Sequence, residues 1–203
     1  MLYDLAAGIL LPVCRLLFHL TFHGLEQVPQ SGKVILCSNH KSVFDPIFLA
    51  CAVKKSTGRR IRFMAKSELF DEHGNLVAAL LRHLGAFPVR RNSGDSGSVK
   101  IALSVLRAEG MVGIFPQGGC VPDNTPFRPK AGVAMIAQLA RAPVLPACIY
   151  CDGEPRPFRR VSVRFGPVIS ENTFESEEKK RDILKKSSEK VAKSINLLLE
   201  EGY

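Results

Sequence analysis

The sequence predicts a single α/β domain, with a mostly parallel or mixed β-sheet covered by helices and an apolar helical segment at the N-terminus. Strand-like and helix-like segments alternate along nearly the whole chain, which is the order typical of this class. Hydrophobic residues make up 46% of the 203 residues, which is enough for a packed core. A chain of this length forms one domain, or one domain with an appendage.

The first segment, residues 1–23, is strongly apolar and is expected to be helical. Its uninterrupted apolar stretch, residues 5–14, is about half of the ~20 residues that a helix needs to span a bilayer. We therefore expect this segment to lie in the membrane interface rather than to cross the membrane. The alternative is that it packs on the protein's own core. Residues 24–203 are expected to form the α/β domain.

Apolar runs and turn signals place the elements of this domain. Short apolar runs between turn residues predict strands at residues 34–37, 59–66, 111–115, 142–149 and 161–165. Helices are predicted at residues 47–53, 76–84 and 99–109, and another is predicted to end at residue 139. Gly85 and Gly110 are expected to end two of these helices. Ser176 is expected to cap a last helix, whose apolar stripe consists of Ile183, Leu184, Val191, Ile195 and Leu198.

The chain is basic, with a net charge of +9 from 28 basic and 19 acidic residues. Such a balance implies an anionic partner: nucleic acid, phospholipid headgroups or a phosphorylated substrate. Nucleic acid is not expected, because the chain has three Tyr, no Trp and no stacking or zinc-finger signature. The six cysteines show no disulfide spacing, so we expect reduced thiols in a cytosol-facing protein. His19 and His23 have a metal-like spacing but no third ligand near them, so no metal site is expected.

The polar block at residues 38–46 carries the candidate chemistry. His40 follows the first predicted strand, and Asp45 stands five residues later. A histidine takes a proton near neutral pH, and it works best when a carboxylate holds its other ring nitrogen. An offset of five is not a same-face helical spacing, so the two side chains meet only if one lies in the turn. On local chemistry alone, this pairing and a plain helix cap at Asp45 beside a loop histidine are equally supported.

The motif Asn39-His40-x-Ser42-x-x-Asp45 resembles the NHxSxxD block of the glycerolipid acyltransferases, the lysophosphatidate acyltransferase family. The resemblance continues in order over residues 24–169, and its further segments are residues 24–29, 65–70, 85–90, 127–134, 142–149 and 166–169. It implies that His40 is the catalytic base and that Asp45 orients it.

The resemblance also implies a phosphate site. In the family's second block an arginine binds the phosphate of the lysophospholipid; Arg90 holds the matching position, with Arg91 beside it. A planar guanidinium offers paired donors that fit a phosphate. The alternative is a solvated arginine on an edge strand. Lys66, in another matching segment, is a further candidate for substrate binding.

The family's FPEGTR block is altered in this chain. Residues 115–120 read FPQGGC, so Gln117 replaces the glutamate, Gly118 is kept and Cys120 replaces the arginine. Glutamine keeps the shape of glutamate and can donate and accept hydrogen bonds, but it carries no charge. Gln117 and Gly118 remain candidates for substrate binding. Our hypothesis is that Arg128 and Lys130 supply the missing charge.

The resemblance implies transfer of a fatty acyl group from acyl-CoA or acyl-carrier-protein to a lysophospholipid, 1-acylglycerol-3-phosphate in the first instance, which gives phosphatidate. The acyl carrier is a co-substrate and no cofactor is implied. The expected location is an anionic membrane surface on the cytoplasmic face. Two alternatives stay open. In the first, the protein is an acyltransferase whose acceptor is another lyso-lipid, such as a lyso-ornithine lipid. In the second, it is a non-catalytic, membrane-bound protein that binds a lipid or an acyl carrier.

Overall fold

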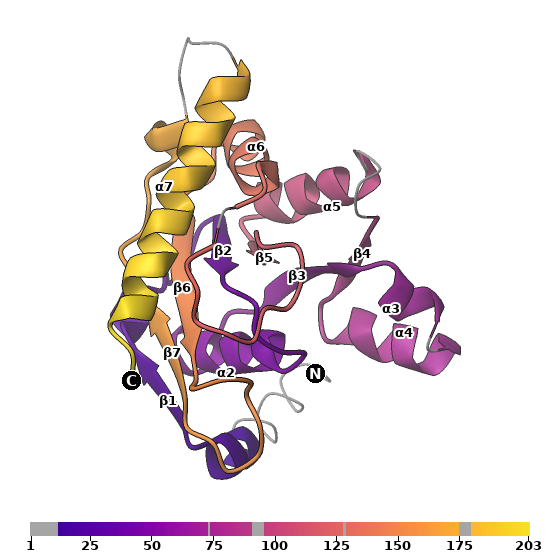
Figure 1. Cartoon of the computed structure of the whole chain (residues 1–203). Helices are drawn as coiled ribbons and strands as arrows, with labels where there is room; N and C mark the ends of the chain where they lie inside the picture. The colour runs from indigo at the N-terminus through magenta and orange to yellow at the C-terminus, as the bar shows by residue number, and fades with distance from the viewer. Residues whose placement is uncertain (1–11, 73, 91–95, 128, 175–179) are drawn as a thin grey trace.

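A computed structural model describes residues 12–72, 74–90, 96–127, 129–174 and 180–203. Within these ranges one seven-stranded sheet has the order β1-β7-β6-β2-β5-β3-β4, and helices lie on both of its faces (Figure 1). All neighbouring strands are parallel except β6 and β7, which are antiparallel. The predicted single α/β domain with a mixed sheet is confirmed.

The strands are β1 (Leu20–His23), β2 (Val34–Ser38), β3 (Ile61–Lys66), β4 (Phe87–Val89), β5 (Met111–Ile114), β6 (Val144–Tyr150) and β7 (Val161–Phe165). The helices are α2 (Asp45–Thr57), α3 (Glu68–Asp71), α4 (Gly74–His83), α5 (Ser96–Arg107), α6 (Gly132–Ala140) and α7 (Lys180–Glu200). There are also two short 3-10 helices, η1 (Leu25–Gln27) and η2 (Glu171–Phe174).

β2 lies near the centre of the sheet, paired with β5 on one side and with β6 on the other. All five of its residues are buried, and successive side chains point to opposite faces of the sheet. Val34 and Leu36 pack in the same core cluster as Phe48 of α2, whereas Ile35 and Cys37 pack in the cluster formed with α5, α6 and α7. This strand is buried on both faces, as its continuous apolar sequence predicts.

The N-terminal segment differs from the expectation. Residues 12–18 are helical, but Leu20–His23 forms β1, which pairs in parallel with β7. Cys14 and Phe18 are buried in the core with Leu20. β1 belongs to the sheet of the α/β domain, because it pairs with β7. The boundary predicted after residue 23 would therefore cut the first strand off from its own sheet. Residues 1–11 lie outside the described residues.

Within the described part of this segment Cys14 and Phe18 pack on the protein's own core, whereas Leu16 is exposed, so the membrane-interface location stays a prediction. No helix within the described ranges is long and apolar enough to cross a bilayer.

The other predicted elements are present with shifted ends. The helix predicted at residues 76–84 is α4, and Gly85 beyond it has a left-handed φ of 92°. The helix predicted at residues 99–109 is α5, which begins at Ser96. Val191 and Ile195 of the predicted C-terminal stripe are buried on α7. Ser176, its predicted cap, lies outside the described residues.

Candidate active site

His40 lies just past the C-terminal end of β2, near the centre of the sheet. The carboxyl ends of strands in open α/β sheets form the crevice where such folds bind ligands. Buried Asn39 holds the chain at this point. Its side-chain amide donates to the carbonyl of Ile149 at 2.9 Å, and its side-chain oxygen accepts from the Ile149 N–H at 2.7 Å. These bonds hold the chain against β6 after the regular pairing of β2 has ended.

The carboxylate of Asp45 organises the turn that follows. It is fully buried and accepts four hydrogen bonds. Its Oδ2 accepts from His40 Nδ1–H at 2.8 Å, from Lys41 N–H at 2.6 Å and from Ser42 N–H at 2.9 Å; its Oδ1 accepts from the Ser42 hydroxyl at 2.8 Å. A buried carboxylate is costly unless its oxygens are paired in this way.

These contacts decide between the two interpretations of Asp45. The N-cap of α2 is Phe44, whereas Asp45 is the first helical residue and is followed by Pro46. The carboxylate does not cap the helix that it begins, because it points back into the preceding turn and meets His40. The interpretation as a plain helix cap is wrong. The His40–Asp45 pair is present, and its catalytic role stays a prediction.

The imidazole of His40 is held at its edge and on its face. A carboxylate can only accept, so Nδ1 donates in this contact, and in the neutral ring Nε2 is then the nitrogen that carries the lone pair. The ring stacks on Phe115, with centroids 4.1 Å apart and planes at 16°, and Phe115 stacks in turn on Phe63. Gly113 makes room for this stack, because a Cβ there would lie only 2.3 Å from Phe63 Cδ1.

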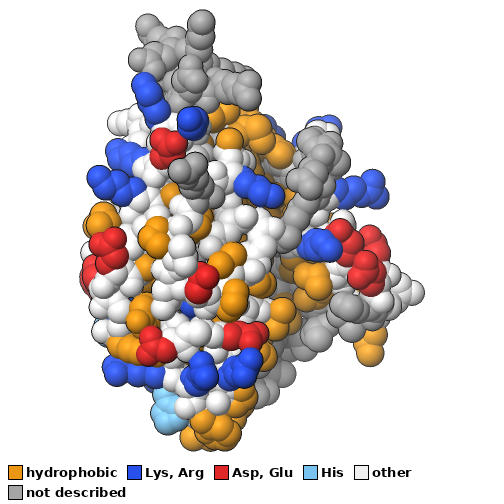
Figure 2. All heavy atoms as spheres, in the orientation of Figure 1, with side chains coloured by type: hydrophobic (Ala, Val, Ile, Leu, Met, Phe, Trp, Pro, Cys, Tyr) orange, Lys and Arg blue, Asp and Glu red, His pale blue; other side chains and the backbone are white. Residues whose placement is uncertain are grey.

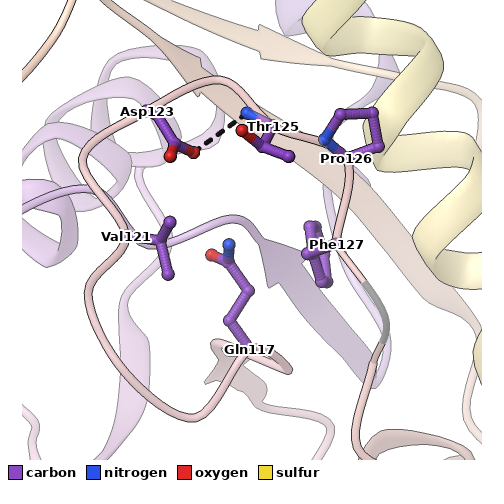
Figure 3. A pocket seen from close by; sticks show the side chains of 6 residues that line it. All are labelled: Gln117, Val121, Asp123, Thr125, Pro126 and Phe127. Carbon is purple, nitrogen blue, oxygen red and sulfur yellow. Dashed lines mark hydrogen bonds between the residues drawn. The ribbon is translucent and has the colours of Figure 1, made fainter.

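The loop after β5 closes over the backbone of His40. The His40 N–H donates to Gln117 Oε1 at 2.5 Å, and the His40 carbonyl accepts from the Val121 N–H at 2.7 Å. A neutral amide oxygen suffices for the first bond, which explains how glutamine serves at a position where the family pattern has glutamate. The predicted role of Gln117 toward substrate stays a prediction. Its side chain also borders a small pocket of about 270 Å³ formed with residues 121–127 (Figure 3).

Sequence reasoning missed Lys41, which is buried despite its charge. Its Nζ donates to Asn124 Oδ1 at 2.7 Å, and Asn124 Nδ2 donates to the carbonyl of Cys151 at 3.2 Å. Burial lowers the pKa of Lys41, while the neighbouring groups Cys151 and Asp123 oppose that shift. Lys41 thus ties the loop at residues 121–127 to the turn that holds His40. The sequence signal for Lys41 was its position inside the NHxSxxD block, between His40 and Ser42, whose side chains both bond Asp45.

A cavity of about 860 Å³ opens beside His40. Most of its lining side chains are apolar and come from α2, β3, α4, α5 and α6; they include Ile47, Phe63, Leu81, Val99, Met135 and Ile136. The volume lies in the range of small-molecule sites, and the lining suits an alkyl chain. No group of three or more His, Cys, Asp or Glu side chains in the described part of the chain is placed to hold a metal ion.

The cavity brings together several residues that the sequence singled out. His40, Lys66, Arg90 and Gly118 line it, as does Lys130, and Asp45 lies buried behind His40. Lys66 Nζ also pairs with Glu68 Oε1 at 3.2 Å. The remaining candidates, Arg91 and Arg128, lie outside the described residues.

Cys120 also lines the cavity, and sequence reasoning treated it only as the loss of an arginine. Its Sγ lies 3.3 Å from His40 Nε2.

A carboxylate-bound histidine lies beside an apolar cavity at the carboxyl edge of an α/β sheet, an arrangement suited to an enzyme that uses a general base on an apolar substrate. The acyltransferase family model matches residues 19–150, and the chain belongs to that family. It is an acyltransferase.

Two curated relatives carry the name 1-acyl-sn-glycerol-3-phosphate acyltransferase. The chain is 32% identical over 147 residues to the protein of Bacillus subtilis (strain 168), which covers 72% of this chain and 70% of the relative. It is 29% identical over 127 residues to the protein of Streptococcus pneumoniae (strain ATCC BAA-255 / R6), which covers 62% of this chain and 45% of the relative. This chain therefore spans less than half of the length of the second relative.

The fold is similar to the crystal structure of PlsC, the 1-acyl-sn-glycerophosphate acyltransferase from Thermotoga maritima. The TM-score is 0.69, and the match covers 99% of this chain and 82% of that chain, at 21% sequence identity.

The four bonds to Asp45 generate a stability prediction. Both carboxylate oxygens of Asp45 act as hydrogen-bond acceptors. In Asp45→Asn an N–H₂ group, which can only donate, replaces one of these oxygens, so at least one buried donor loses its partner. We expect the free energy of unfolding to fall by about 1–3 kcal/mol. Urea unfolding followed by circular dichroism measures this change.

Ser42→Ala is the matched control, because it removes one donor to the carboxylate, together with the acceptor of the Phe44 N–H, and leaves the other three donors paired with Asp45. Its expected cost is smaller, about 0.5–1.5 kcal/mol. Equal losses in the two variants would contradict the assignment of Asp45 as the centre of the turn.

Proposed function

We propose that this acyltransferase moves a fatty acyl group from an acyl thioester, acyl-CoA or acyl-carrier-protein, to the free hydroxyl of 1-acylglycerol-3-phosphate, forming phosphatidate. The observation that carries the proposal is the orientation of His40. Its Nδ1–H is bound by buried Asp45, while the His40 side chain lines an apolar cavity of about 860 Å³. The names of the two curated relatives support the same acceptor.

The residues of the site account for the proton transfers. His40 Nε2 takes the proton of the acceptor hydroxyl, whose oxygen attacks the carbonyl carbon of the acyl thioester, and the carboxylate of Asp45 stabilises the imidazolium that forms. The proton then passes to the departing thiolate of the acyl carrier. Neither step needs a metal ion or a redox group. The apolar walls favour the acyl chain, since each buried methylene contributes about 0.8 kcal/mol, and binding both substrates in one cavity supplies orientation.

Basic side chains at the same cavity support recognition of a phosphate. Arg90 is exposed and lines the cavity, as does Lys130. The end of the Lys130 side chain lies over Gly118, since a Cβ built at Gly118 would be 2.8 Å from Lys130 Nζ. Gly118 has a left-handed φ of 78°, so glycine suits this position in both conformation and size. Lys130 thus brings a cation beside the altered block that lacks the family's arginine.

We also infer association with an anionic membrane surface on the cytoplasmic face. Figure 2 shows Lys and Arg side chains distributed over one face, with acidic side chains among them. Leu16 and Phe158 are both 75% exposed, and the Phe158 N–H donates to the carbonyl of Leu17, so these two apolar groups belong to adjoining segments. Arg156, Arg159 and Arg160 are exposed on the same loop as Phe158. Exposed apolar groups flanked by cations suit a phospholipid interface.

The test of the proposed function is thiol release from a long-chain acyl-CoA in the presence of lysophosphatidate, with the lipid product separated by thin-layer chromatography. We expect phosphatidate from the wild type and a loss of about 100-fold or more in His40→Ala, the scale of one acid–base group. Circular dichroism of the variant checks that the fold is intact. Equal rates in the two proteins would remove His40 from the chemistry, and a wild type that makes a different lipid would refute the acceptor.

The phosphate contacts generate a second prediction. Arg90→Ala and Lys130→Ala should each raise the KM for lysophosphatidate about tenfold, equivalent to about 1.4 kcal/mol of lost binding. With 1-acylglycerol, which lacks the phosphate, neither variant should change the KM. The matched control is Arg107→Ala, which removes an exposed arginine from the end of α5, outside the cavity lining. An unchanged KM for lysophosphatidate in both variants would contradict the phosphate site.

A further inference from the structure

Lys41 carries a charge in a buried place that the substrate cavity does not reach. Its side chain is 1% exposed and does not line the cavity beside His40. Burial lowers the pKa of Lys41, and the carboxylates of Asp123 and Asp152 are among the groups that oppose this shift. Taking an ammonium out of water is costly unless the group is paired. The proton transfers at His40 do not use this group, so its burial calls for another role.

The ammonium fixes the orientation of the Asn124 side chain. Lys41 Nζ donates to Asn124 Oδ1 at 2.7 Å, and Asn124 Nδ2 donates to the carbonyl of Cys151 at 3.2 Å. An ammonium can only donate and a carbonyl can only accept, so one orientation of the amide satisfies both partners. An apolar side chain at position 41 would leave the Asn124 oxygen without this donor and would remove the constraint on the amide.

The loop that carries Asn124 also holds the backbone of His40. Val121, three residues before Asn124, donates its N–H to the His40 carbonyl at 2.7 Å. Two consecutive residues of the catalytic turn, His40 and Lys41, therefore hold two points of the loop at residues 121–127. A shift of the loop at Asn124 would be passed to the Val121 N–H and from there to the backbone of His40.

The turn and the loop are both tied to the end of β6. Asn39 exchanges two hydrogen bonds with the backbone of Ile149 in β6. Asn124 bonds the carbonyl of Cys151, which directly follows β6. His40 thus lies between two segments that are fixed to the same strand, and strands buried in the core are the rigid part of such a fold. The bond from Lys41 to Asn124 joins the two segments in front of that strand.

We propose that Lys41 is a positioning residue for His40. Through Asn124 it holds the loop at residues 121–127 where the Val121 N–H meets the His40 carbonyl. The inference deepens the proposed function and rests on it for the role of His40 as the base. A general base must come within about 2.6–3.2 Å of the hydroxyl that it deprotonates. Because a misplacement of about 1 Å can cost about 100-fold in rate, a backbone anchor of the base bears directly on kcat.

The first test is Lys41→Met, which removes the ammonium and keeps an unbranched side chain. We expect the kcat of thiol release from palmitoyl-CoA with lysophosphatidate to fall by about 10–100-fold. The KM of each substrate should change by less than about twofold, because Lys41 does not line the cavity. The matched control is Lys100→Met at an exposed lysine of α5, which should keep the wild-type kcat. A wild-type kcat in Lys41→Met, or a raised KM with an unchanged kcat, would overturn the inference.

A double-mutant cycle tests whether Lys41 acts through Asn124. Asn124→Leu should lower kcat as Lys41→Met does, and the double variant should lose no more than either single variant, because the two residues are partners in one contact. Asn124→Asp keeps an oxygen for the ammonium, so its kcat should stay closer to the wild type than that of Asn124→Leu. Losses that add in the double variant would show separate roles and would contradict the proposal.

Stability separates positioning from support of the fold. Each single variant leaves a buried polar group without its partner, whereas Lys41→Met with Asn124→Leu replaces both partners by apolar groups. We therefore expect the urea midpoint of the double variant to return toward that of the wild type, while its kcat stays low. A kcat that recovers together with the midpoint would make Lys41 a structural residue only.

Hydrogen exchange followed by mass spectrometry gives a readout that needs no substrate. The amide of Val121 should exchange faster in Lys41→Met than in the wild type, and the amides of β6 should exchange as before. Unchanged exchange at Val121 would overturn the inference whatever lipid the enzyme makes. A wild type that releases thiol through His40 but forms a lipid other than phosphatidate would refute the proposed acceptor. In that case a low kcat and fast Val121 exchange in Lys41→Met would still support the positioning role.

Discussion

The interaction on which the site depends is the set of hydrogen bonds that converge on the buried carboxylate of Asp45. Two backbone N–H groups, one hydroxyl and the His40 ring share its two oxygens. The same bonds close the turn after β2, start α2 and fix the proton on Nδ1 of His40. A buried carboxylate held by several donors is a rigid partner, and this rigidity lets one histidine nitrogen face the cavity at a constant angle.

The rest of the site holds His40 from its other sides. Asn39 ties the preceding backbone to β6, and Gln117 satisfies the His40 N–H from the loop after β5. Phe115 fixes the plane of the ring, and Gly113 in β5 leaves the space that the aromatic stack requires. The block that departs from the family pattern therefore still performs its structural task through a neutral oxygen. Its last residue adds a thiol where the family pattern has a guanidinium.

Local patterns predicted the fold, because alternating apolar runs and turn residues are properties of neighbouring residues. The spacing of His40 and Asp45 was compatible with two structures, and only the direction of the carboxylate, set by the turn, separates them. The strand at residues 20–23 was not predicted, since its partner β7 lies far along the chain. The burial of Lys41 depends on Asn124 in a distant loop, and the contact of Cys120 with His40 joins residues 80 positions apart. Long-range contacts of this kind leave no periodic signal in the sequence.

The central claim is that Asp45 fixes His40 in the tautomer whose Nε2 is unprotonated, and ¹⁵N NMR of the histidine side chains tests it most directly. The chain has five histidines, and a His40→Gln spectrum assigns the signals of His40. At a pH where the ring is neutral, the account predicts a protonated Nδ1 and an unprotonated Nε2, and loss of this preference in Asp45→Asn. A protonated Nε2 with a bare Nδ1, or an equal mixture that Asp45→Asn leaves unchanged, would contradict it.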